Sequence, residues 1–270
     1  MKLFIFFILM GSLYAYDVIR FSPLPMENAS RTLEIFQPFM EYLENKSGKK
    51  VQLVYKGTNV EVIEALKNKE IDLAHFGALP YVKLTQKYQD IIPIVQFLEK
   101  NGLDSYTCTL FKRKDIKIDL SNIVHKKFAL THKYSTCGYV FVEHLLSKYD
   151  STLKNNNFKY VGSHYTVIAD VVTGDFDLGG VKTSIFNKFD YLDIEPIEES
   201  ELNPSLMIVA NLGTLTKKDT LELQTIILSA TQKDKKNWDK KINSIGIIPD
   251  IKALEEYRQR IENIEIEDEK

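Results

Sequence analysis

Apolar and polar residues alternate in two repeating patterns along this chain, and these patterns predict short strands and amphipathic helices in turn. Residues 17–22 and 51–55 read as strands. Between them, residues 31–46 predict a helix that Ser47-Gly48 ends. Its apolar stripe comprises Leu33, Phe36, Phe39, Met40 and Leu43. The chain therefore opens as strand, helix, strand.

The same order continues through the first half. The helix 60–69 carries a stripe of Val60, Ile63 and Leu66, and Pro80 suits the first turn of a helix that runs through Tyr88. Strands are predicted at residues 71–77, 91–97 and 105–111. This alternation is typical of an α/β lobe with a largely parallel sheet.

The second half repeats this order and predicts a second lobe. Strands are predicted at 128–131, 158–161 and 177–181, and helices at 139–148 and 164–173. Residues 206–212 read as a strand that returns to the first lobe, followed by helices at 220–230, around Trp238 and at 251–264. We therefore expect lobe 1 at residues 16–107 and 207–264, lobe 2 at 108–206, and a cleft between them.

The first 15 residues predict a secretory signal peptide. Lys2 gives a positive start, residues 3–10 are apolar, and the small-residue exit ends at Ala15. A buried strand or a membrane anchor is the alternative, but the apolar run is shorter than the ~20 residues that span a bilayer. No cysteine follows the apolar run to accept a lipid, so we expect a free periplasmic protein. The acidic end 265–270 is expected to be a solvated tail.

Composition narrows the range of functions. The 270 residues are 44 % hydrophobic and 27 % charged with a formal charge of −2, so no basic face for nucleic acid is indicated. Five histidines and two cysteines are scattered without ligand spacing, so neither a metal site nor a cofactor is expected.

Ser135-Thr136-Cys137-Gly138, which we call the anion seat, lies between the predicted strand 128–131 and the following helix. A strand, a polar turn and a helix in that order place unpaired backbone N–H groups and two hydroxyls at one helix N-terminus, where anions bind. Simple helix capping by Ser135 and Thr136 is the alternative.

Other polar residues have two interpretations each. His164 either caps its own helix or takes up a proton beside an anion and donates to it. His75, on an apolar strand, is either a core histidine or a ligand contact. Cys137 at a helix N-terminus with His164 as base suggests a nucleophile, but no third orienting residue is evident. Pairing of Cys108 with Cys137 stays open, because a disulfide needs Cα atoms within about 7 Å.

Several segments in order resemble the substrate-binding proteins of phosphonate, phosphite and phosphate ABC importers, the PhnD-type family. They are KGTNVEVIEALKNKEIDLAHFGALPYV, STCGYVF, YVGSHYTVIADVVTGDFDLGGV and LGTLTKKDTLELQTIIL. The resemblance covers nearly all of the chain after the leader. It implies the bilobed type II periplasmic binding protein fold, with an oxyanion bound in the cleft between two α/β lobes.

The resemblance also implies roles for particular residues. The hydroxyls of Ser135 and Thr136 would act with the amides around Cys137 and Gly138. The family usually has serine at position 137, so a weaker thiol donor replaces a hydroxyl there. His164, Tyr106 and Phe76 match the family's histidine, its crossover aromatic and the aromatic before the first lobe's glycine.

Departures from the family pattern bear on the ligand. A tyrosine that the family often offers falls at about Asn59, and the acidic residues that hold an amine fall at about Ser184 and Leu206. An ammonium would be buried without a carboxylate. We therefore expect phosphate, phosphite or a simple alkyl phosphonate rather than 2-aminoethylphosphonate.

We expect a monomer, not an enzyme, whose lobes close about the crossovers near residues 107–111 and 205–209 and which an ABC permease then reads. Two alternatives remain at this point. The client is a sensor kinase or a chemoreceptor, or the ligand is another small anion such as a sulfonate or carboxylate.

Overall fold

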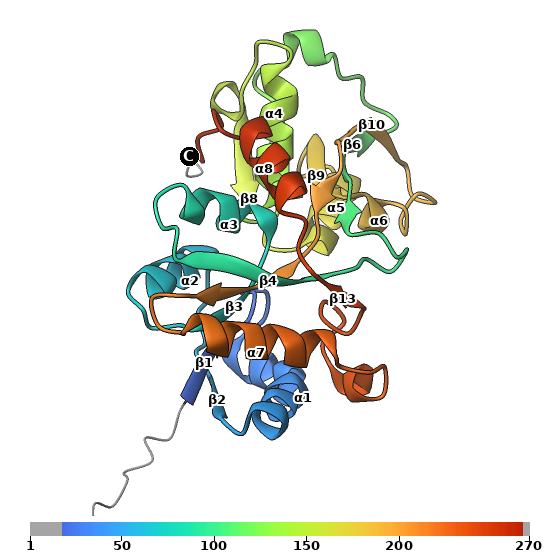
Figure 1. Ribbon diagram of the computed structural model, residues 1–270. Helices are drawn as coiled ribbons and strands as arrows, with labels where there is room; N and C mark the ends of the chain where they lie inside the picture. Colours follow the sequence, from blue (N-terminus) through green and yellow to red (C-terminus); the bar gives the residue numbers. More distant parts are fainter. Residues whose placement is uncertain (1–17, 267–270) are drawn as a thin grey trace, which may run out of the picture.

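A computed structural model of the chain describes residues 18–266 (Figure 1). The predicted signal peptide at 1–15 lies outside the described residues, as does the end of the predicted acidic tail, 267–270.

The larger sheet has the strand order β13-β4-β12-β3-β1-β2. Its strands are β1 (Val18–Ser22), β2 (Lys50–Leu53), β3 (Leu73–Phe76), β4 (Ile91–Phe97), β12 (Met207–Asn211) and β13 (Gly246–Ile247). β1 pairs in parallel with β2 and β3, whereas β12 runs antiparallel between β3 and β4. The predicted return at 206–212 is thus a central strand of this sheet.

Helices cover both faces of the larger sheet. Residues of α1 (Ala29–Ser47) and α7 (Lys217–Leu228) share one core cluster with Phe21 and Leu73. Residues of α2 (Asn59–Lys67) and α3 (Ala78–Thr85) share another with Ala74 and Phe76. Because neighbouring residues of a strand face opposite sides, β3 contributes to both cores.

The smaller sheet has the order β10-β6-β9-β7-β8. Its strands are β6 (Cys108–Arg113), β7 (Lys127–Leu130), β8 (Asn157–Tyr160), β9 (Leu178–Lys182) and β10 (Ile194–Glu199), and its helices are α4 (Phe141–Ser147), α5 (His164–Thr173) and α6 (Thr183–Phe186). β7 is parallel to β8 and β9, and β6 is antiparallel to β9 and β10. A two-stranded ribbon of β5 (Ser105–Tyr106) and β11 (Asn203–Pro204) lies at the crossover between the sheets.

Strand directions place the functional edges of both sheets at this crossover. Cys108, the first residue of β6, is opposite Lys182, the last of β9, so the chain enters the smaller sheet at the carboxyl ends of its parallel strands. In the larger sheet, Met207 is opposite both Gln96 near the end of β4 and Phe76 at the end of β3. The two carboxyl edges, where α/β sheets bind ligands, therefore meet at the crossover.

The last helix, α8 (Ile251–Arg260), lies across this junction (Figure 1). Arg258 donates to the Val82 carbonyl in α3 at 2.9 Å, and Arg260 donates to Glu201 beside β11 at 2.9 Å. One core cluster continues from α2 and α3 of the larger sheet to the smaller sheet and α8.

Some sequence predictions were wrong in detail. The expected strand 105–111 is divided, because β5 pairs with β11 and β6 begins at Cys108. The strand β10 escaped notice because its charged residues hide any apolar alternation. The expected helix at Trp238 is a 3₁₀ turn, Asp234–Asn237. Leu33 and Val60 are 45 % and 41 % exposed and do not belong to their predicted stripes.

Candidate functional site

The anion seat is a capped helix N-terminus that follows β7. Ser135 has an extended backbone, and its hydroxyl accepts from the Gly138 amide at 2.9 Å. Its carbonyl accepts from Tyr139 at 3.1 Å and Val140 at 3.2 Å, so the helix begins with a π-type turn, Thr136–Val140, before α4. The amides of Thr136 and Cys137 have no hydrogen-bond partner within residues 18–266. Two N–H donors are therefore available to an anion.

Two glycines allow the anion seat to pack closely on the smaller sheet. A Cβ on Gly138 would lie 2.2 Å from the Thr131 hydroxyl and 2.6 Å from the Thr131 amide. A Cβ on Gly180 in β9 would lie 2.5 Å from the Cys137 carbonyl and 2.6 Å from Val142. All four distances are too short for a side chain at either position, so the turn can pack this closely only over glycine.

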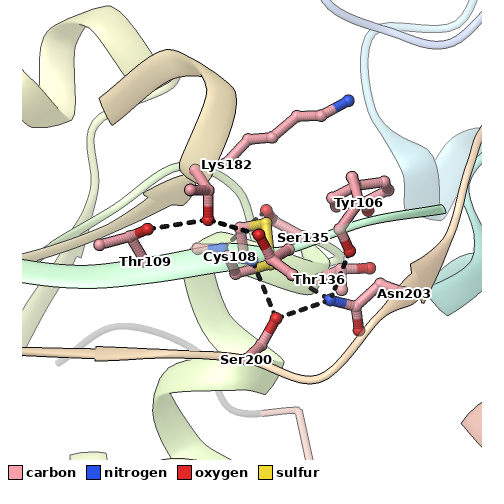
Figure 2. Close-up of a disulfide and its surroundings, with 12 residues drawn as sticks. Tyr106, Cys108, Thr109, Ser135, Thr136, Lys182, Ser200 and Asn203 are labelled. Atoms are coloured by element: carbon pink, nitrogen blue, oxygen red, sulfur yellow. Dashed lines mark hydrogen bonds between the residues drawn. A yellow bond between two sulfur atoms is a disulfide. The ribbon is translucent and has the colours of Figure 1, made fainter. Parts of the chain in front are cut away.

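Cys108 and Cys137 form a disulfide with a Cα–Cα distance of 5.1 Å (Figure 2). The bond joins the start of β6 to the anion seat, and both residues are buried. It settles the pairing that the sequence left open. The expected thiol donor at Cys137 was wrong, because a disulfide sulfur carries no proton. The nucleophile interpretation loses its thiolate for the same reason.

The Thr136 hydroxyl lies close to two tyrosines, the buried Tyr257 and the partly buried Tyr106. It lies 3.1 Å from the Tyr257 hydroxyl of α8, and either group is the donor. Burial raises the pKa of Tyr106 to about 12, although a hydrogen bond with Thr136 acts in the opposite direction. Burial, reinforced by Tyr106, also raises the pKa of Tyr257. Both phenols are therefore neutral at neutral pH. When the Tyr257 hydroxyl is the donor to Thr136, the Thr136 proton is free for a ligand.

A small cavity of about 30 Å³ lies behind this hydroxyl, between α4, α8 and the strand that ends at Glu199. Its lining includes Thr136, Tyr257 and Arg260. The Arg260 guanidinium already donates to Glu201 and to the Asn203 side chain, each at 2.9 Å. With its cation satisfied in this way, the cavity is not built to hold a free anion.

His164 is the first residue of α5, and Lys182 is the last residue of β9. The Lys182 amide donates to His164 Nδ1 at 3.4 Å, and the Lys182 ammonium lies 4.3 Å from the centre of the Tyr106 ring. Burial, together with the nearby charges of Lys182 and His132, lowers the pKa of His164 to about 4. The neutral imidazole accepts at Nδ1, so its proton is on Nε2, where it is a donor for an anion.

The remaining predicted residues belong to the larger sheet and its helices. His75 is fully buried between Phe36 and Phe97, and burial lowers its pKa to about 3. Phe76, at the end of β3, is a fully buried core residue. Asn59 begins α2 at the carboxyl edge of the larger sheet, and its buried Oδ1 has no hydrogen-bond partner among residues 18–266.

Sequence reasoning missed two residues of the site. Lys182 follows the buried strand residues Gly179, Gly180 and Val181, and a cation at the end of such a strand is a signal that could have found it. Tyr257 lies 121 residues from Thr136, and no local pattern connects them.

The described residues were also searched for metal sites and membrane spans. Between residues 18 and 266 no cluster of three or more histidine, cysteine or carboxylate side chains is arranged to hold a metal. In the same range no helix has the length and apolarity to cross a bilayer.

Comparison with known proteins gives consistent matches. Residues 21–250 match the family model described as ABC transporter, phosphonate, periplasmic substrate-binding protein. A curated relative, the phosphate-import protein PhnD of Mycolicibacterium smegmatis, is 23 % identical over 210 residues. That alignment covers 73 % of this chain and 65 % of the relative, so the chain spans about two thirds of the relative's length.

Two solved structures share the fold over nearly the whole chain. PhnD1 from Prochlorococcus marinus, in complex with methylphosphonate, has a TM-score of 0.74 at 19 % identity, with 92 % of this chain and 99 % of that chain covered. A binding protein component of an ABC phosphonate transporter from Pseudomonas aeruginosa has a TM-score of 0.74 at 20 % identity, with 91 % and 85 % covered.

Proposed function

This chain belongs to the family of periplasmic substrate-binding proteins of phosphonate ABC transporters, and we propose that it captures a small phosphorus oxyanion between its two lobes. Phosphate, phosphite and simple alkyl phosphonates are the ligands in question. The observation that carries the proposal is the pair of amides of Thr136 and Cys137, which have no partner within residues 18–266, at a helix N-terminus. The disulfide joins this N-terminus to Cys108, which is opposite Lys182 in the smaller sheet.

The donor set is sufficient for a useful affinity. Hydrogen bonds to a charged group contribute about 1.5–3 kcal/mol each, and a helix N-terminus adds roughly 0.3–1 kcal/mol. The two amides, the Thr136 hydroxyl and His164 Nε2 make four donors. At the upper end of these ranges, the set covers the roughly 8 kcal/mol of a micromolar complex together with association costs of about 4 kcal/mol.

The acidic groups support a ligand without an amine. Ser184 and Leu206 stand where the family resemblance places carboxylates that hold an ammonium. Glu99 is the acid that lies against Lys182, and its carboxylate is already paired with that ammonium at 2.6 Å. An ammonium group on the ligand would meet Lys182 rather than a free carboxylate, which disfavours 2-aminoethylphosphonate.

Closure and delivery complete the proposal. The lobes, which we place at 16–107 with 207–264 and at 108–206, swing about the crossovers next to β5 and β11, and closure excludes water from the anion. A monomer in the closed form, free in the periplasm after loss of its leader, then passes the ligand to an ABC permease.

Calorimetric titration of the oxidised protein tests the ligand class. Bound ligand is first removed by unfolding and refolding without reductant. Phosphate, phosphite and methylphosphonate are then compared with sulfate, an alkyl sulfonate and acetate. We expect at least one phosphorus anion to bind tightest. If all three leave both the heat signal and the melting temperature unchanged at millimolar concentration, the proposal fails.

A variant pair locates the binding. His164→Ala removes one donor and should weaken binding by about tenfold. The control is His125→Asn, an exposed histidine at positive φ on the far side of lobe 2, where asparagine is well tolerated. Equal losses in the two variants would place the ligand elsewhere.

A further inference from the structure

An ion pair between Lys182 and Glu99 connects the two lobes near the anion seat. Lys182 ends β9 of the smaller sheet, and Glu99 lies in the turn that follows β4 of the larger sheet. The Lys182 ammonium and a Glu99 carboxylate oxygen are 2.6 Å apart, and the side chains are only 22 % and 21 % exposed. Charges this well shielded interact more strongly than those of an exposed surface pair.

Several contacts fix Lys182 next to the anion seat. Its ammonium lies over the Tyr106 ring, and its amide bonds to His164. In the sheet it is opposite Cys108, whose sulfur is bonded to Cys137 of the anion seat. Figure 2 shows its side chain extending from the strand beside the disulfide, with the ammonium directed away from the sulfur atoms.

We propose that Lys182 determines ligand selectivity, because its ammonium binds both Glu99 and the bound oxyanion. The cleft therefore favours anions of higher negative charge and rejects ligands that carry an ammonium. This inference rests on the proposed function. An ammonium has three donors on a flexible stem, so Lys182 can turn part of its hydrogen bonding to the ligand. Glu99 holds the ammonium when the site is empty and repels an incoming anion.

The proposal predicts opposite changes in ligand affinity when Lys182 and Glu99 are substituted. Removing Lys182 removes an attractive charge, whereas removing the Glu99 charge removes a repulsive one and frees the ammonium for the ligand. An ion pair that only holds the lobes closed behaves differently, because loss of either partner breaks the same bond. In that case both substitutions would weaken binding.

The test is calorimetric titration of Lys182→Gln and Glu99→Gln at pH 7 and low salt. The probes are phosphate, methylphosphonate and 2-aminoethylphosphonate. We expect Lys182→Gln to bind phosphate about tenfold more weakly and Glu99→Gln to bind it several-fold more tightly. The preference for methylphosphonate over 2-aminoethylphosphonate should narrow in Lys182→Gln. The control Lys188→Gln removes another lysine that lies over a tyrosine, at 5.9 Å from the Tyr165 ring on the surface of lobe 2, and should change nothing.

Each outcome decides the matter. Parallel losses in both variants, or no change in either, overturn the inference and leave the proposed function intact. If Lys182→Gln does not fold, Glu99→Gln decides alone, because a gain in affinity supports the inference and a loss overturns it. A wild-type protein that binds none of the phosphorus anions ends both proposals.

Discussion

Removal of the Cys108–Cys137 disulfide should lower stability strongly while it leaves the anion seat in place. The bond closes a loop with a sequence separation of 29. Loop-closure entropy for that length corresponds to about 3.5 kcal/mol of lost stability. For a chain of this size, such a loss lowers the melting temperature by roughly 7–14 °C.

The variant that tests this reasoning is Cys108→Ala with Cys137→Ser. Serine is the residue that the family resemblance implies at position 137, so its hydroxyl is compatible with the turn. The Ser135 cap and the close packing over Gly138 and Gly180 persist without the sulfur bridge. We therefore expect ligand affinity to change by no more than about threefold, well under the tenfold loss of a deleted charged hydrogen bond.

The assay is scanning calorimetry with and without dithiothreitol. Reductant should lower the melting temperature of the wild type to that of the double variant and should not affect the variant. Thiol titration in denaturant should find no reactive thiol before reduction. An unchanged melting temperature would refute the stability argument. A tenfold loss of affinity in a variant that melts normally would show that the bond shapes the seat.

Three further substitutions, one of them with a control at Gly57, test other parts of the structure. Gly180→Ala should lower the free energy of unfolding, measured by chemical denaturation, by about 1–3 kcal/mol through overpacking, and it should weaken ligand binding. The control is Gly57→Ala, whose Cβ would lie 3.5 Å from a Glu61 carboxylate oxygen and which should leave the free energy of unfolding unchanged. Thr136→Val should weaken ligand binding by about tenfold in calorimetry and cost about 1 kcal/mol of stability, because the buried Tyr257 hydroxyl loses a partner. Burial holds the pKa of His75 at about 3 against 6.5 for the free side chain, so the unfolded chain takes up a proton first and stability falls as the pH drops from 6.5 toward 3. His75→Leu should make the stability less dependent on pH in this range in acid denaturation. An equally steep pH profile in the variant would contradict this reasoning.

Local patterns predicted most of the fold because most of its elements bury one face of their own sequence. The strand at β7, the polar turn and the helix after it follow one another, so the anion seat was readable from a single segment. The strand β10 could not be predicted from its own segment, because it contains three glutamates, a proline and a bulge and shows no apolar alternation. Its position is determined by pairing with β6. The break at Thr107 likewise depends on β11, which lies almost a hundred residues away.

The site residues, too, were predicted only in part from the sequence. His164 and Tyr106 were found because a family resemblance placed them, and the structure connects both to Lys182. In the sequence, His75 is a histidine near the end of an apolar strand, as a cleft histidine would be. It lies on the side of β3 that packs against Phe36 and Phe97, and this side does not face the group around Lys182. An alternating strand does not reveal which of its two faces meets a cleft when both are buried.

The disulfide shows how a distant residue determines what a local motif becomes. The strand order β6-β9-β7 separates the two cysteine-bearing segments by β9, because Cys137 follows β7 and Cys108 begins β6. The turn at Cys137 must therefore pass over β9 to reach Cys108, and it does so at Gly180, where a Cβ would lie 2.5 Å from the Cys137 carbonyl. A side chain at position 180 would lift the turn away from the sheet and away from Cys108. The missing side chain in β9 is thus a condition for the covalent bond, and it could be recognised only once the strand order was known.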